Sequence, residues 1–226
     1  KAIIILREFG YSEVEKRGYY SPSEHRHYRS LKKENNIAAI EIHSEILGVE
    51  KFRKEFNYSI VEKDSQVIDE VRVLSYANKL NLSIIAYQIN DSGFYYKTMA
   101  LRNAYDVFLL SKKTIAKEAV NALDKLTNPL NCFLAACYEI FSKVNSLKYN
   151  NTKATTSYLS IFNRQFINPK ATKKRQKILK IFLFTKLRLN ILYKAAVYKK
   201  YRVWLFKRVS DKSWQKEKLI QLGFKK

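Results

Sequence analysis

The sequence has 226 residues, of which 46% are hydrophobic and 28% are charged, which is typical of a globular protein with one or two domains and a buried core. Its formal net charge of +23 favours a polyanionic partner, although a lysine-rich composition from an AT-rich genome would give a similar value. Lys180, Lys186 and Arg188 interrupt the most apolar stretch, so we expect neither a membrane span nor an export signal.

The positive charge is concentrated near the C-terminus. Residues 141–226 hold 23 Lys and Arg against 2 Asp and Glu, whereas residues 1–140 hold 20 against 18. This asymmetry predicts a basic surface that faces phosphate, in a nucleic acid, a nucleotide or an anionic membrane face.

The first residues, "KAIIILREFGY", have the pattern of the last turns of a helix that ends at Gly10. Because this pattern begins without an initiator methionine, we expect further chain upstream. "YSEVEK" alternates briefly like a strand, and "RGYYSPSE" has the composition of a loop.

Residues 24–47 are predicted to form a β-hairpin whose two strands are joined by the polar turn "KKENN". In the second strand, 37–47, Ile40 and Ile42 point to one face. Glu41 and His43 therefore share the opposite face. On the first strand, His25 and His27 have the same spacing; exposure to solvent is their simplest interpretation, and a three-histidine metal site is an alternative.

From residue 64 onwards the hydrophobic period changes towards that of a helix. Ser75 is placed to cap a helix over 76–89, which Asp91-Ser92-Gly93 would end. Further helices are expected at 97–113, 114–124, 130–147 and 154–166, followed by a long basic helix from Lys173 to about Val209 that is broken at most once.

Smaller patterns within these helices lead to three further predictions. The helix over 97–113 would have an apolar face that contains Leu101, Ala104, Tyr105, Phe108 and Leu109, and Arg102 would pair with Asp106 on the same side. Cys132 and Cys137 lie five apart in an apolar run, a spacing that suits neither a zinc site nor a disulfide framework, so we expect reduced core thiols and a cytoplasmic protein.

The order of these features resembles the nucleotidyltransferase-like family related to the abortive-infection nucleotidyltransferases of the polymerase β superfamily. The matching stretches are a helix end with "GY", a short strand, a loop with tyrosines, "HRHYRSL", a polar turn, "IEIHSEIL" and the helical "LRNAYDVFLLSK". In that superfamily two acids spaced Asp-x-Asp follow a Gly-Ser or Gly-Gly motif, and a third acid lies in a hydrophobic-acid-hydrophobic triplet. Ile40-Glu41-Ile42 matches this triplet, and the resemblance covers most of residues 1–125.

The resemblance implies that Glu41 is a catalytic carboxylate and a ligand of Mg²⁺ or Mn²⁺, with a nucleoside triphosphate as substrate. Several carboxylates converge in such a site because two divalent cations bridge the triphosphate and activate the attacking hydroxyl. His43 would lie near the phosphates or the acceptor as a polar contact. The Gly-Ser motif and the Asp-x-Asp pair do not occur in the sequence, so we expect them upstream of Lys1, on another chain, or lost from an inactive derivative.

These observations predict an α+β fold. Residues 1–63 would be the remnant of a polymerase β-type nucleotidyltransferase sheet, a β-hairpin plus a helix, and residues 64–226 a mainly α-helical domain that ends in the long basic helix. The leading hypothesis is transfer of a nucleotidyl group from a nucleoside triphosphate to an unidentified hydroxyl, with RNA or another polyanion as acceptor.

Two other hypotheses use the basic C-terminal part instead. One is a non-catalytic nucleic-acid-binding module, in which the long basic helix engages the nucleic acid. Tyr193, Tyr198, Tyr201 and Trp204 interleave with its cations; a stacking platform for bases is one interpretation, and a core face beside a solvated face is the more common one at helical spacing. The other is docking on an anionic membrane, which ranks lower if the apolar side of the helix is needed for the core.

Overall fold

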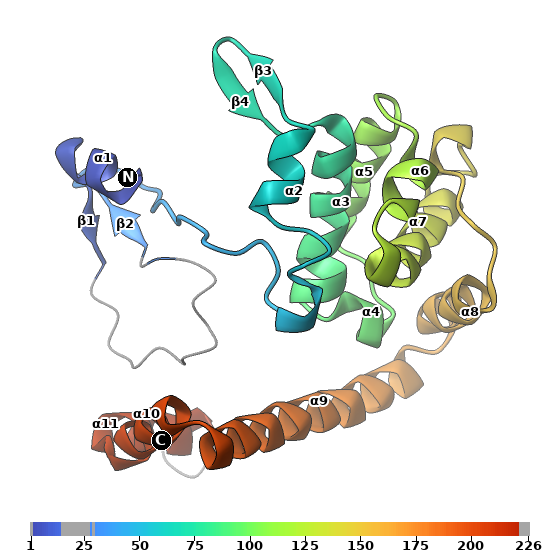
Figure 1. Cartoon of the computed structure of the whole chain (residues 1–226). Helices are drawn as coiled ribbons and strands as arrows, with labels where there is room; N and C mark the ends of the chain where they lie inside the picture. Colours follow the sequence, from blue (N-terminus) through green and yellow to red (C-terminus); the bar gives the residue numbers. More distant parts are fainter. Residues whose placement is uncertain (1, 15–27, 29, 222–226) are drawn as a thin grey trace. The chain divides into compact units, whose positions relative to one another are not determined.

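The computed structural model describes residues 2–14, 28 and 30–221 (Figure 1). Its α-helices are α1 Ala2–Glu8, α2 Tyr58–Lys63, α3 Tyr76–Ile85, α4 Gly93–Tyr96, α5 Leu101–Ser111, α6 Ala116–Asn121, α7 Thr127–Ile140, α8 Lys153–Ile167, α9 Pro169–Val197, α10 Lys199–Ser210 and α11 Lys212–Gln221. The strands are β1 Ser12–Glu13, β2 Leu31–Lys32, β3 Gln66–Ile68 and β4 Val71–Val73.

The described fold is mainly helical, with two small two-stranded antiparallel sheets, which confirms the α+β composition at this coarse level. The chain divides into two compact units. The terminal unit comprises Lys1–Ser44 and Ile181–Lys226, and the central unit comprises Glu45–Lys180. The predicted division into domains of residues 1–63 and 64–226 stays a prediction.

Helix α1 ends as the sequence predicts. Gly10 has φ +82° and therefore takes the left-handed conformation that follows many helices. The Tyr11 amide donates to the Leu6 carbonyl at 3.0 Å, and the Gly10 amide donates to the Arg7 carbonyl at 2.9 Å. This pair of hydrogen bonds satisfies the last carbonyls of α1 and turns the chain towards β1.

Helix α7 forms the centre of the central unit. Every residue from Pro129 to Cys137 is buried, which is expected of a helix that is apolar on all sides. Helices α3, α5, α6 and α8 contact it, and Cys132 and Cys137 are free thiols in its core. The prediction of reduced core thiols is thus confirmed.

Several helices lie where the sequence places them. The Ser75 hydroxyl accepts from the Asn78 amide at 3.2 Å and caps α3, which continues into a π-helical turn, Ala86–Asn90. The long basic helix is broken once, at Tyr198 between α9 and α10. Helix α7 ends at Ile140, earlier than predicted, because Ser142 and Lys143 take left-handed conformations with φ of 57° and 61°.

Two short elements differ from the sequence prediction. The segment after residue 64 begins not with a helix but with a hairpin, β3 and β4, joined by Asp69 and Glu70, which both have positive φ. Just before it lies helix α2, for which no helix was predicted; the Asn57 side chain caps it by accepting from the Ile60 amide at 3.1 Å.

Helix α5 buries only part of the face that was predicted: Ala104 lies in the core and Phe108 packs against it. Its buried residues are Ala104, Val107 and Ser111, whereas Leu101, Tyr105 and Leu109 are exposed. Both sets follow helical spacing, and α5 packs its smaller side chains against α3, so the backbones approach closely. Arg102 and Asp106 lie within the described residues but form no ion pair there, so this prediction was wrong.

A half-buried lysine ties α4 to α8 within the central unit. The Lys97 ammonium lies 3.9 Å from the centre of the Phe94 ring and 5.3 Å from that of Tyr158, and burial lowers its pKa. Arg175, in the first turns of α9, donates to the Tyr96 carbonyl at 3.1 Å and so covers the C-terminal end of α4. We assign this cluster a structural role.

Candidate functional site

The candidate site lies where β2 pairs with the segment that contains Glu41. Leu31 pairs with Glu13 of β1 on one side and with Ile40 on the other. Leu31 and Ile40 exchange two backbone hydrogen bonds of 2.8 Å each, and Leu31 is 1% exposed. The predicted hairpin is therefore present as a short antiparallel pairing. On the second arm, 37–47, the Ile42 carbonyl also accepts from the Tyr28 amide at 2.7 Å, and His43 lies in a further β-bridge.

The exposure of this arm alternates in the predicted sense. Ile40 and Ile42 are half-buried, whereas Glu41 and His43 are exposed. Positions that flank an antiparallel pair on the same side share a face of the sheet, so Ser30 lies beside Glu41. The Ser30 hydroxyl donates to Glu41 Oε1 at 2.7 Å, and Ser30 is 7% exposed. A buried hydroxyl thus orients an exposed carboxylate.

Sequence reasoning did not find Ser30. The turn that it predicted, "KKENN", is present, since the Asn36 amide donates to the Lys33 carbonyl at 3.1 Å and Asn35 has φ 63°. The first ladder pair is nevertheless Leu31 with Ile40, so the connection is longer than the turn alone. Because a shift of one residue would move every side chain to the other face, the partner of Glu41 depends on this register.

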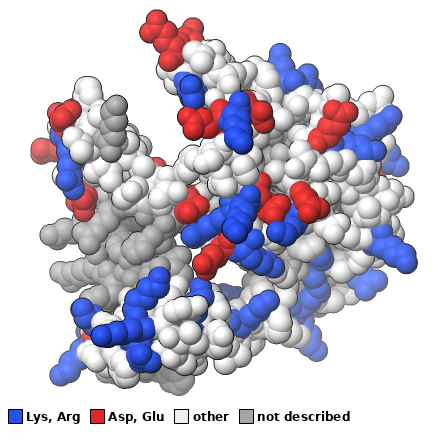
Figure 2. Space-filling model, viewed as in Figure 1, with Lys and Arg blue, Asp and Glu red and all other residues white. Residues whose placement is uncertain are grey.

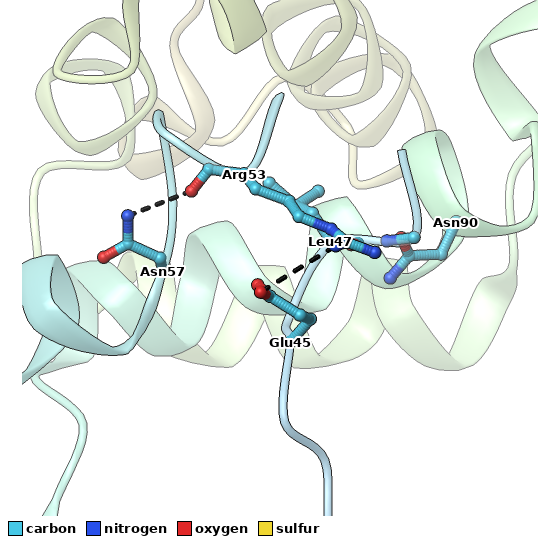
Figure 3. A network of polar contacts seen from close by, with 6 residues as sticks. Glu45, Leu47, Arg53, Asn57 and Asn90 are labelled. Atoms are coloured by element: carbon cyan, nitrogen blue, oxygen red, sulfur yellow. Dashed lines mark hydrogen bonds and ion pairs between the residues drawn. The ribbon is translucent and has the colours of Figure 1, made fainter. Parts of the chain in front are cut away.

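The chain is firmly anchored just after the candidate site. Glu45 lies 3.8 Å from the Arg53 guanidinium, and Arg53 Nε donates to the Leu47 carbonyl at 3.2 Å. The Asn90 side chain accepts from the Gly48 amide at 2.8 Å and donates to the Ile46 carbonyl at 3.2 Å. Figure 3 labels Glu45, Leu47, Arg53 and Asn90, with Asn57 beside them. The two Asn90 hydrogen bonds hold the start of the central unit against the end of the π-helical turn.

The metal site that the resemblance implies was tested against the donors present. The described residues contain no group of three His, Cys, Asp or Glu side chains that could hold a metal ion. Magnesium takes six oxygen ligands, so Glu41 with its described neighbours does not form a magnesium site by itself. His25 and His27 lie outside the described residues, and with them the predicted alternative of a three-histidine site.

The basic surface predicted for the C-terminal part is carried by α9 and α10. No Asp or Glu occurs between residues 140 and 210, a stretch that holds 18 Lys and Arg. Figure 2 shows Lys and Arg side chains among uncharged ones over these helices. Apolar side chains of α9 are exposed as well, among them Phe182 at 58% and Leu189 at 60%. Among the described helices, none is long and apolar enough to cross a membrane.

Comparisons of the chain with protein-family models, with curated proteins and with solved structures found no match.

Proposed function

We propose that the chain contributes Glu41 to a site that transfers a nucleotidyl group from a nucleoside triphosphate to a hydroxyl acceptor, with pyrophosphate as the leaving group. The observation that carries the proposal is the state of Glu41 itself. Its carboxylate is exposed beside a paired strand, and the buried Ser30 hydroxyl orients it at 2.7 Å. A carboxylate fixed in this way on a sheet face suits a position where charge must be placed accurately.

The role of each residue follows from this placement. Ile40 and Ile42 anchor the segment through their half-buried side chains, so Glu41 is held between two fixed points. His43 shares the exposed side and would contact the phosphates or the acceptor as a hydrogen-bond partner. The other carboxylates of such a site would come from outside the described residues, and divalent metal ions, when bound, would neutralise the charge of the triphosphate.

The proposal is tested by label transfer in the natural chain that contains these residues. With a nucleoside triphosphate labelled at the α-phosphate and Mg²⁺ or Mn²⁺, we expect Glu41→Gln to lower incorporation by about 100-fold or more, because the amide removes a charged ligand. Glu34→Gln is the matched control, since Glu34 is an exposed acid in the turn of the same hairpin. Equal incorporation by both variants would remove Glu41 from the site.

Non-catalytic nucleic-acid binding is the second candidate, and the absence of acidic residues between 140 and 210 favours it. This candidate predicts RNA binding that weakens steeply with salt, because each phosphate contact releases counterions. It also predicts that Glu41→Gln leaves the affinity unchanged. An active label transfer that depends on Glu41 separates the two candidates.

A further inference from the structure

Five exposed apolar side chains of α9 lie along one side of the helix. With about 100° between successive residues, Ile181, Phe182, Leu189, Leu192 and Tyr193 fall within an arc of about 120°. We name these five residues the apolar stripe. Their exposed fractions are 58%, 58%, 60%, 54% and 67%.

The opposite side of α9 is buried in part, although Phe184 and Leu187 are each 53% exposed there. Leu183 and Ile191 are half-buried and Ala195 is 6% exposed, and their directions lie away from the stripe. Docking on a membrane ranks below the other hypotheses if the core needs the apolar side of this helix. The apolar stripe is exposed and is not part of the core.

Charges border the stripe. Lys186 and Arg188 project on either side of it, and neither α9 nor α10 contains an acidic residue. We propose that the stripe docks on the surface of an anionic lipid bilayer, with the five apolar side chains at the boundary between headgroups and acyl chains and the bordering cations against lipid phosphates.

The charge pattern disfavours the other occupants of this surface. A second copy of α9 would bring the same cations together along both edges of the stripe, with no acid to offset them. A nucleic acid would use the cations but would leave Ile181, Leu189 and Leu192 in water, since a phosphate backbone offers nothing for aliphatic side chains to pack against. An anionic bilayer accommodates both kinds of side chain.

Co-sedimentation of the full chain with lipid vesicles tests the proposal. We expect binding to vesicles of equal parts phosphatidylcholine and phosphatidylglycerol, and little binding to phosphatidylcholine alone. Binding should weaken between about 0.1 M and about 1 M salt, as the Debye length falls from about 10 Å to about 3 Å. Equal binding to the two vesicle types would overturn the proposal. The absence of binding to either type would also overturn it.

A pair of matched variants separates the stripe from the overall charge. Leu189→Glu places a carboxylate in the stripe, whereas Leu187→Glu makes the same change on the opposite side of α9, where Leu187 is 53% exposed. We expect Leu189→Glu to weaken vesicle binding by about 10-fold or more and Leu187→Glu by about 2-fold.

Equal losses in the two variants would contradict a role for the stripe. A second contradicting result would be that both variants bind polyuridylate tightly and neither binds vesicles, because the cations would then serve nucleic-acid binding. The test does not involve Glu41, so its outcome is independent of the proposed nucleotidyl transfer.

Discussion

At the scale of single residues, the pair of Ser30 and Glu41 carries the functional proposal. In this proposal Ser30 is a positioning residue, because its hydroxyl donates to the Glu41 carboxylate. Groups that orient a ligand in this way contribute about 10- to 100-fold to activity or metal affinity in proteins where they have been removed. The hydrogen bond therefore predicts a measurable loss when the hydroxyl is deleted.

We expect Ser30→Ala to lower kcat of label transfer by about 10-fold with little change in KM for the nucleotide. Ser30→Thr keeps the hydroxyl and should restore most of the loss. A steady-state comparison of the three proteins gives both constants. If Ser30→Ala and the parent protein had the same kcat, the hydrogen bond would have no part in positioning Glu41.

The sequence predicts part of this site and not the rest. The alternation of Ile40, Glu41 and Ile42 indicates which side chain is exposed, since side chains of a strand alternate whatever its partner. The identity of the partner depends on the register, and the polar loop before Ile40 contains no pattern that defines it. Ser30 therefore becomes visible only when the pairing of Leu31 with Ile40 is known.

The buried thiols make stability depend on pH. Burial raises the pKa of Cys132 from 9.0 to about 11, with nearby Lys97 opposing the shift, and burial also raises the pKa of Cys137. Between pH 9 and about 11 the unfolded chain loses the thiol proton while the folded chain keeps it. The free energy of unfolding should therefore fall as the pH rises through this range.

Each thiol can lower the free energy of unfolding by up to about 1.4 kcal/mol per pH unit. Denaturant unfolding at pH 8, 9, 10 and 11 measures the slope. The Cys132→Ala variant, although less stable, should show a shallower decline, because one of the titrating groups is gone. The same slope in both proteins would contradict the assignment to Cys132.

At the scale of elements, the prediction succeeds where a local signal ends or begins a helix. Gly10 ends α1 and Ser75 caps α3, since a left-handed glycine and a capping hydroxyl act within a few residues of the chain. The β3–β4 hairpin was missed because Asp69 and Glu70 lack the glycine or asparagine that usually indicates such a turn. The buried face of α5 was predicted only in part, because the predicted and the observed sets share the helical period and overlap at Ala104, and only the packing against α3 defines which residues are buried.

The short helix α4 offers a test of packing between elements. A Cβ atom on Gly93 would lie 2.5 Å from two carbon atoms of the Tyr87 ring, which the Thr98 hydroxyl holds through a 2.9 Å hydrogen bond. Gly93→Ala should therefore destabilise the protein by about 1–3 kcal/mol, although alanine is the better helix former.

A double-mutant cycle checks this cause by denaturant unfolding. In a Tyr87→Leu background the ring is absent, so Gly93→Ala should cost clearly less than in the parent protein. An unchanged cost in both backgrounds would show that the ring is not the obstacle.

At the scale of the whole molecule, the positive charge is distributed unevenly along the chain. The concentration of Lys and Arg after residue 140 can be counted in the sequence, and it predicts a cationic surface without naming its partner. The exposure of the apolar stripe on α9 depends on tertiary packing, because helical spacing alone is the same for a core-facing side. The proposed lipid contact of α9 and the proposed role of Glu41 concern different parts of the chain, so each is tested independently.

The most direct test of the account is label transfer from an α-phosphate-labelled nucleoside triphosphate by the natural chain, compared between Glu41→Gln and Glu34→Gln. The account predicts transfer that requires a divalent cation, persists in Glu34→Gln and falls by about 100-fold or more in Glu41→Gln. Transfer that Glu41→Gln retains in full would contradict the central claim that Glu41 is a catalytic carboxylate.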